Sequence, residues 1–469
     1  MLRLRLRSAG ACITAAAAAL VCSMPNTASA EISSDRVEFM GYGRMGIGWT
    51  KSGQVVSGRY MNLTRRRALG GRLEEGDYLE PMMRLHLKKA DKDKDTETTV
   101  DLVTSFEMYS SGGSVVSSLS NGDTDSIKIF PEQAYIQAKN VFTPGLEIWL
   151  GSRLYRKNDI HIADYYYFNN LPAQGVGAIY TRPGFGEIDV AILTKTGSSP
   201  FFRTNVGMPD GPPQQVTRQR TMFVAEYKYL FGPKTSFVQA LGELHVVPRS
   251  GKQDIQTDAA VNPPDWGAVG GAKVHLDFGG DSFSDTSIRY GTRIANGAES
   301  GGSTFDTFGS TAADGTYKGA YGVELVEHFG IDIQRVVGIN GYFAAHYSQG
   351  TSDLAPSATP RDANARSDYV VGVRPTIFVT DQFHMITEAT FQTRKDDGKA
   401  QGMAVKLSVV PTIVPSGGRS MWTRPHIRGI YTLGIYNQAA QDQLMSQFLE
   451  TVGPTKLAHF VGARTEWWF

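Results

Sequence analysis

The chain has 469 residues and a formal net charge of +1 at pH 7. Its 47 Lys and Arg nearly balance its 46 Asp and Glu, which gives no electrostatic case for nucleic-acid binding, since that calls for a basic patch or stripe. The 51 Gly, 20 Tyr and 23 Phe form a glycine- and aromatic-rich composition that argues against a helical protein.

The first thirty residues have the features of a secretory signal peptide. Three arginines occur within the first seven residues, an apolar run covers 15–21, and Ala28 to Ala30 form a small-residue cleavage site. The apolar run is too short to span a bilayer. We therefore predict that 1–30 is removed and that the mature domain covers 31–469.

The predicted mature chain contains no cysteine and no transmembrane helix. Cys12 and Cys22 are the two cysteines of the sequence, and both fall in the predicted signal segment, which excludes a disulfide or a cysteine metal site. Loss of the three signal arginines takes the net charge from +1 to −2. No later apolar stretch is long enough for a transmembrane helix.

Residues 37–49, VEFMGYGRMGIGW, alternate between two faces. Phe39, Ile47 and Trp49 share one face, and Tyr42 and Arg44 share the other, as in a strand with one apolar side. The length matches a tilted membrane strand with its rims. The GxGxxG within this run is not followed by a helix pattern, so it does not indicate a dinucleotide site.

The same alternation recurs along the chain, separated by long polar segments typical of barrels with long loops on one side. We expect Trp422 and Arg424 to share a strand face with His426 and Arg428. Predicted strands fall within 78–88, 100–107, 187–192, 371–374, 405–409, 422–431 and 456–469, and predicted loops at 197–219, 247–266, 296–317, 349–367 and 392–401.

One stretch is too polar for an apolar core. Residues 153–168, RLYRKNDIHIADYYYF, combine three cations, His161, two carboxylates and an aromatic run. Burying such a mixture is costly unless every charge has a partner. It suits a narrow aqueous passage for a polar solute. Together with the signal segment and the terminal aromatic residue Phe469, this favours an all-β, transmembrane antiparallel β-barrel over a soluble sandwich.

At this point the sequence resembles a known family, the maltoporin-like sugar porins of Gram-negative outer membranes. The resemblance rests on VEFMGYGRMGIGW, on QAYIQAKNVF and LEIWLGSRLYRKNDIHIADYYYF, on YVVGVRP, on SMWTRPHIRGI and on the terminal EWWF. It implies eighteen strands, a homotrimer in outer-membrane lipids, and an inward-folded constriction loop into which 153–168 runs. It also implies facilitated diffusion of sugars or oligosaccharides.

The family binds sugars on an aromatic slide flanked by polar tracks, which fits the apolar face and the hydroxyl rim of a pyranose. The resemblance assigns these two roles to the residues of this chain that match the corresponding positions of the family. The matching slide positions are Tyr42, Tyr78, Trp422 and Trp468, and the matching track positions are Arg44, Arg72, Glu80, Lys157, Asp159, Asp164 and Tyr166. For the track arginine at Arg72, Arg67 is a rival because of gaps.

The sequence also departs from the family. The slide aromatic that a neighbouring subunit contributes should fall within 110–130, where the stretch SSGGSVVSSLSNGDTDSIK offers none. Thr286 aligns with a slide phenylalanine, Phe283 being the nearest aromatic. Glu132 aligns with a track arginine. These departures put a specificity for long malto-oligosaccharides in doubt but leave the architecture intact.

Two other classes remain open, a general diffusion porin without specific sugar binding and a secreted glycan-binding β protein. An enzyme is not predicted, because no nucleophile motif such as GxSxG occurs. No cofactor or metal is predicted either, since Asp159 and His161 have no evident third ligand. The partners expected are sugars, outer-membrane lipids and two further copies of the chain, with no nucleic acid.

Overall fold

The computed structural model describes the chain from Ile32 to Phe469 with gaps. The described residues are 32–33, 36–50, 60–63, 70–90, 96–110, 115, 127–196, 200–208, 211–232, 235–250, 262–297, 303–351 and 364–469. The predicted signal segment 1–30 and the rival Arg67 lie outside them, as does almost all of the aromatic-free stretch expected within 110–130.

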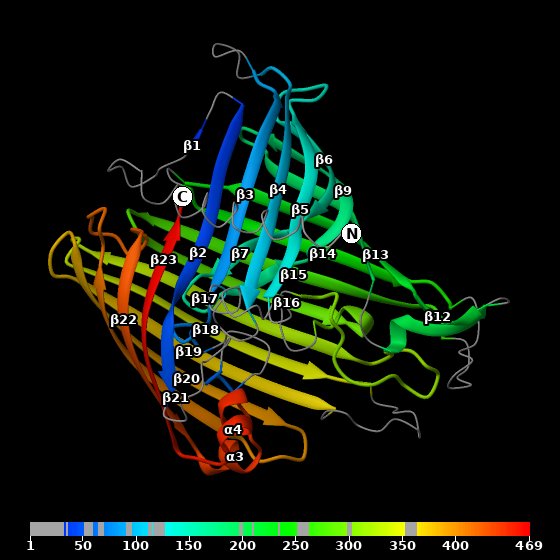
Figure 1. Cartoon of the computed structure of the whole chain (residues 1–469). Coiled ribbons are helices and arrows are strands. Elements are labelled where there is room, and N and C mark those ends of the chain that lie inside the picture. Colours follow the sequence, from blue (N-terminus) through cyan, green and yellow to red (C-terminus); the bar gives the residue numbers. More distant parts are fainter. Residues whose placement is uncertain are drawn as a thin grey trace, which may run out of the picture.

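The structure is a closed antiparallel barrel of eighteen strands (Figure 1), which confirms the predicted fold class. A two-residue strand, β1 (Ile32–Ser33), pairs only with β2 and is not part of the wall. The wall consists of β2 (Val37–Thr50), β3 (Tyr78–Lys88), β4 (Thr99–Ser110), β5 (Ile127–Lys139), β6 (Leu146–Arg153), β9 (Ala173–Arg182), β10 (Gly186–Thr196), β13 (Gln219–Leu230), β14 (Phe237–Val247), β15 (Asp265–Gly279), β16 (Ser282–Thr292), β17 (Tyr321–Ile333), β18 (Val337–Gln349), β19 (Ala365–Phe378), β20 (Phe383–Asp396), β21 (Gly402–Ile413), β22 (His426–Tyr436) and β23 (Leu457–Trp468).

The barrel closes where the first wall strand meets the last. β2 pairs with β23 from Tyr42 opposite Trp468 to Thr50 opposite Phe460. Gly43 is required at this seam, because a Cβ there would come within 2.3 Å of the Trp467 ring. Closure leaves no exposed strand edge, which a barrel needs in order to sit in a bilayer.

The period-2 pattern sorts side chains between the two sides of the wall. On β21, Leu407 and Val409 are 45% and 48% exposed, whereas Lys406 and Ser408 are 1% and 4% exposed. The exposed apolar residues point outward to hydrocarbon, and the buried polar residues point into the barrel. A polar interior and an apolar exterior are the reverse of a soluble protein.

The strand connections differ between the two ends of the barrel. One end carries 89–98, 140–145, 183–185, 231–236, 280–281, 334–336, 379–382 and 414–425. The other carries 51–77, 111–126, 154–172, 197–218, 248–264, 293–320, 350–364, 397–401 and 437–456. The longer ones hold small elements: the hairpin β11 (Arg203–Met208) and β12 (Gly211–Thr217), the 3₁₀ helices η2 (Pro200–Phe202) and η3 (Arg293–Ala295), and the helices α3 (Gln438–Asp442) and α4 (Gln447–Val452). Among the described residues no helix is both long and apolar enough to cross a membrane.

Two boundaries differ from the sequence-based expectation. The polar segment expected at 392–401 is shorter, because β20 continues to Asp396, whose carboxylate accepts from Arg366 at 2.7 Å. Trp422 and Arg424 were expected on a strand, but β22 begins at His426. The pairing of β22 with β23 starts at His426, opposite Glu466.

Several connections leave the wall and bond to its inner side, and two of them meet at Arg72. One is the hairpin of β7 (Arg156–Ile160) and β8 (Tyr165–Asn170), inserted between the paired strands β6 and β9. The other is 70–77, whose Gly70 N–H donates to Tyr342 on β18 at 3.1 Å and whose Glu74 forms an ion pair with Lys406 on β21 at 2.5 Å. These two segments meet at Arg72, which donates to the His161 carbonyl at 3.2 Å.

The hairpin is hydrogen-bonded to three strands of the wall. Lys273 on β15 donates to Asn158 at 2.6 Å, Asn169 donates to Glu226 on β13 at 2.5 Å, and the Tyr165 hydroxyl donates to Glu324 on β17. At the tip, Asp164 has a φ of 48°, a left-handed conformation that Asp tolerates better than most residues. The hairpin therefore crosses the interior of the barrel.

Candidate functional site

A cavity of about 680 Å³ lies between the hairpin and the wall built by β2 to β5 and β23. Its walls carry both aromatic rings and charged groups. The lining residues that matter here are Tyr42, Arg44, Arg72, Tyr78, Glu80, Glu107, Glu132, Arg156, Asp159, His161, Asp164, Tyr166 and Trp468. Strands supply most of them, because inward-facing residues recur at every second position.

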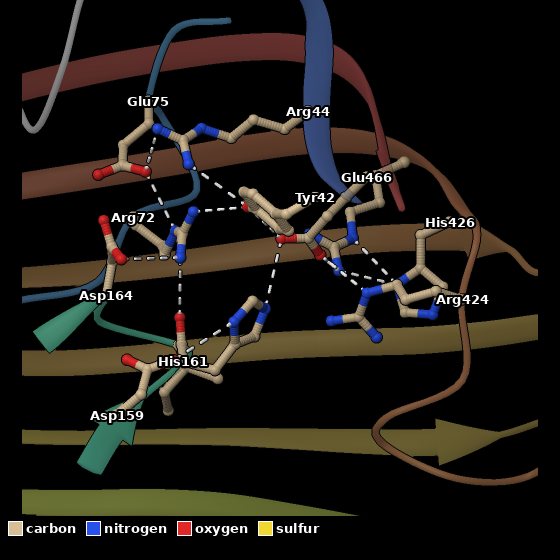
Figure 2. A network of polar contacts seen from close by, with 12 residues as sticks. Tyr42, Arg44, Arg72, Glu75, Asp159, His161, Asp164, Arg424, His426 and Glu466 are labelled. Atoms are coloured by element: carbon tan, nitrogen blue, oxygen red, sulfur yellow. Dashed lines mark hydrogen bonds and ion pairs between the residues drawn. The ribbon is translucent and has the colours of Figure 1, made fainter. Parts of the chain in front are cut away.

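Tyr42 and Arg72 are at the centre of a hydrogen-bond network (Figure 2). The Tyr42 hydroxyl donates to Glu466 at 3.0 Å and accepts from Arg72 at 2.6 Å. Arg72 also pairs with Glu75 at 3.0 Å and lies 3.6 Å from Asp164. Every polar group around the Tyr42 ring is therefore fixed in place, which preorganises the face of the ring toward the cavity.

Aromatic rings form a row along this network. Tyr78 and Tyr42 lie 5.9 Å apart between centroids, Tyr42 and His161 6.2 Å, and His161 and Trp468 5.0 Å. The row continues from His161 to Trp422 at 6.4 Å. Spacings of this size are those of neighbouring rings in contact. The Tyr42 and Tyr78 rings are tilted by 48°, and the His161 ring meets Tyr42, Trp468 and Trp422 edge-on, at 84°, 86° and 61°.

The row extends past the cavity to Phe283. Its ring lies 6.4 Å from Trp422, with an interplanar angle of 32°. Phe283 is at the start of β16, two residues from the short connection 280–281. The nearest aromatic to the missing slide position therefore lies beside a ring that was assigned to the slide from sequence.

One wall of the cavity is acidic. Glu107 on β4 and Glu132 on β5 lie within hydrogen-bonding distance of each other, and Glu80 on β3 accepts from Tyr78 at 2.9 Å. Arg156 covers the Tyr166 ring at 4.1 Å and lies 3.9 Å from Glu80. In total, five carboxylates and three arginines line the cavity, a formal balance of −2.

Comparison with known proteins agrees with this architecture. The family model described as LamB porin matches residues 37–469. The chain belongs to the LamB porin family. It is therefore a porin, and its barrel lies in the outer membrane.

Solved structures resemble this porin in fold alone. The outer-membrane channel DcaP of Acinetobacter baumannii is 8% identical, with a TM-score of 0.51 over 94% of this chain and 100% of that chain. Pseudomonas aeruginosa OccD3 is 9% identical, with a TM-score of 0.42 over 95% of each chain. Vibrio cholerae OmpT is 10% identical, with a TM-score of 0.39 over 93% of this chain and 100% of that chain.

The cavity of this LamB-family porin brings together nine of the eleven residues predicted from its sequence. Trp422 is next to the cavity and in contact with its His161 ring. The residues lining it are Tyr42, Arg44, Arg72, Tyr78, Glu80, Asp159, Asp164, Tyr166 and Trp468.

Lys157 faces a different part of the porin. Its ammonium lies 3.2 Å from Glu226 and also pairs with Asp189, on the side of β10 and β13. The hairpin register shifts between Arg156 and Asn158, which interrupts the regular alternation that would place Lys157 on the same side as Asp159. Arg156, rather than Lys157, consequently reaches the cavity.

His161 is the ring that sequence reasoning did not place in the row. Its Nε2 lies 3.4 Å from Glu466, and it lies in the turn of the hairpin, outside the membrane-spanning strands. Burial lowers the pKa of His161 to about 4, despite a hydrogen bond to Glu466 that raises it. The imidazole is therefore uncharged at neutral pH and behaves as one more aromatic ring.

Glu466 is the other residue that the sequence did not single out. Its carboxylate pairs with Arg424 at 2.9 Å and with Arg428 at 2.5 Å, and it accepts from Tyr42 (Figure 2). The only signal was its inward parity two residues before Trp468. Parity shows which side a residue faces, but not which partners it meets there.

Proposed function

We propose that this porin is a sugar-selective channel for facilitated diffusion, and that the aromatic row is its slide. The single observation that supports this proposal best is a set of ring contacts at 5.0 to 6.4 Å. Tyr78 contacts Tyr42, Tyr42 contacts His161, and His161 contacts both Trp468 and Trp422. A pyranose packs its apolar face on such rings. Several weak neighbouring sites let a solute advance without being trapped.

Polar groups on both sides of the row supply the remaining contacts. Arg44 lies over the Tyr78 ring at 5.0 Å, and Asp164 lies beside Arg72 on the other side. Sugar hydroxyls need both donors and acceptors, and the arginines and carboxylates provide them. The proposed tracks are Arg44, Arg72, Glu80, Asp159, Asp164 and Tyr166, whereas a track role for Lys157 would need a path on the other side of the hairpin.

The β7–β8 hairpin is proposed to narrow the passage and so serve as the constriction loop. Its bonds to β13, β15 and β17 hold it across the interior. A homotrimer is proposed from the family resemblance. We also propose that the chain is a channel without enzymatic activity, its transport driven only by the solute gradient.

Planar-bilayer recording with a panel of mono-, di- and oligosaccharides tests the proposal. We expect sugars to block the ion current of the wild-type channel. Tyr42→Ala and Trp422→Ala should each weaken the block about tenfold, equivalent to about 1.4 kcal/mol, while ion conductance is kept.

Two matched variants separate the ring from its surroundings. Tyr42→Phe keeps the ring and loses the hydroxyl, so block should largely persist. Trp49→Ala removes an outward-facing ring of the same strand and should leave block unchanged. Absence of block by every sugar would favour the general diffusion porin, and unchanged block in both alanine variants would remove the slide assignment.

A further inference from the structure

A second, much smaller cavity lies behind the arginines of the main one. Its volume is about 10 Å³, room for one particle the size of a water molecule. Five of its eight lining residues are arginines and one is a glutamate. The lining consists of Arg44, Arg72, Leu73, Arg374, Arg428, Ile430, Arg464 and Glu466.

Acidic partners neutralise only part of this positive charge. Arg44 and Arg72 both pair with Glu75, each at 3.0 Å. Arg374 donates to Glu388 at 2.7 Å. Arg428 shares Glu466 with Arg424. Counting Asp164 beside Arg72, five of the six arginines around the cavity form ion pairs with four carboxylates.

Arg464 is the arginine left without an acid. It is 7% exposed, and its Nη1 donates a hydrogen bond to the Leu73 carbonyl at 3.0 Å. Its Nε is buried without a hydrogen-bond partner. Within the described ranges, no carboxylate lies within 4.0 Å of its guanidinium. The residue directly opposite it on β22 is another cation, Arg428.

A buried cation facing a second cation is costly unless a counter-charge neutralises it. The cavity supplies the place for one, and guanidinium donors supply its ligands. We propose that this cavity binds one small inorganic monoanion of about the size of chloride. Phosphate and sulfate are too large for a space that holds a single water-sized particle.

The occupant would also fasten the inward segment 70–77. Leu73 lines the cavity and accepts from Arg464, while Glu74 is anchored on Lys406 at 2.5 Å. An anion among Arg464, Arg428 and Arg72 therefore joins that segment to β22 and β23. The anion thereby stabilises the wall behind the aromatic row, independently of which solute the porin carries.

The first test is a bromide experiment on the wild-type porin. Crystals grown from detergent and soaked in bromide should give an anomalous peak between Arg464 and Arg428. Thermal unfolding of the detergent-solubilised porin should shift upward by several degrees when gluconate is replaced by chloride or bromide at constant ionic strength. Sulfate at the same ionic strength should give no such shift.

Arg464→Gln should abolish the halide-dependent part of the shift and the anomalous peak. Arg366→Gln is the matched control, because Arg366 is also a buried inward arginine but forms an ion pair with an acid, Asp396, at 2.7 Å. It should lower the unfolding temperature but keep the halide response. A wild-type cavity that holds water and no bromide would overturn the proposal, as would an equal halide response in wild type and Arg464→Gln.

Discussion

The two sides of the β7–β8 hairpin use similar polar residues in different ways. On the wall side, Asn169 meets Glu226, whose side chain is 2% exposed. On the cavity side, the Asp159 and Asp164 side chains are 31% and 27% exposed. The Asn169–Glu226 contact on the wall side is therefore buried, whereas the two carboxylates on the cavity side are still open to solute.

This difference separates the residues that hold the hairpin in place from the residues that can bind a passing solute. Buried polar groups with complete partners rigidify a structure, and removing one of the partners is expensive. Half-exposed groups keep lone pairs and N–H groups for a solute that passes. If this division is correct, variants on the wall side should change stability and pore geometry, whereas variants on the cavity side should change selectivity.

The largest effect is expected on the wall side, from Glu226→Gln. Glu226 accepts from Lys157 at 3.2 Å, from Asn169 at 2.5 Å and from Gln239 at 2.6 Å. Loss of its charge should destabilise the hairpin by about 1–3 kcal/mol. We expect a lower unfolding temperature together with a noisier and larger single-channel current, both measured on the purified porin.

Glu243→Gln is the control for this variant. Glu243 is a buried carboxylate on the neighbouring strand β14 that accepts from Thr304 at 2.5 Å and pairs with His245 at 2.9 Å, so it contacts other groups than the hairpin. It should lower stability and leave the current steady. Equal current noise in the two variants would mean that the hairpin is not held by its wall-side bonds.

The wall of the barrel was predictable because one rule governs every strand. Inward and outward positions alternate along each strand. From Arg44 to Glu466, the polar residues of the strands fall mainly at the inward positions. Within the site the rule places Tyr42, Tyr78 and Trp468 correctly on the inner side. Which of them would meet was not predictable, because strand register and inward segments bring together residues far apart in the chain.

The errors in the prediction have specific physical causes. A register shift in the hairpin turns Lys157 away and brings in Arg156. β22 begins at His426, so Trp422 contacts the His161 ring from a connection instead of a strand. His161 joins the row only through the fold of the hairpin turn, and its sequence neighbours give no sign of that.

On the cavity side of the hairpin, replacing Glu132 should change the ion selectivity of the channel. Five carboxylates against three arginines make the passage attractive to cations. Glu132→Gln should reduce the preference for potassium over chloride, and Glu132→Lys, which brings the balance to zero, should reduce it about tenfold, or roughly 1.4 kcal/mol. The reversal potential across a potassium chloride gradient measures this, and the unfolding temperature should change little.

Glu187→Gln is the matched control. Glu187 is an inward carboxylate on β10 that pairs with Lys228 at 3.0 Å and does not line the main cavity. Its replacement should leave the reversal potential close to that of the wild type. The same change in both variants would assign the selectivity to the overall charge of the barrel and not to the acidic wall of the cavity.

The smallest effect is expected from His161, which lies in the turn between β7 and β8. Its pKa in the folded porin is about 4, below the ordinary value of 6.5, so between these pH values the unfolded chain binds more protons at this residue. Stability should therefore fall as pH drops from about 6.5 toward 4. His161→Phe removes this proton, so the variant should lose less stability than the wild type over that window.

Sugar block separates the ring of His161 from its proton. At pH 7 the wild-type imidazole and the phenyl ring of His161→Phe are both uncharged, so block should agree within about twofold, or roughly 0.4 kcal/mol. His161→Gln also cannot titrate in this range, but it interrupts the row between Tyr42 and Trp468, which both contact His161. Block should weaken in the glutamine variant alone. Equal block in all three proteins would mean that solute passes along other rings and that His161 only fills space beside Glu466.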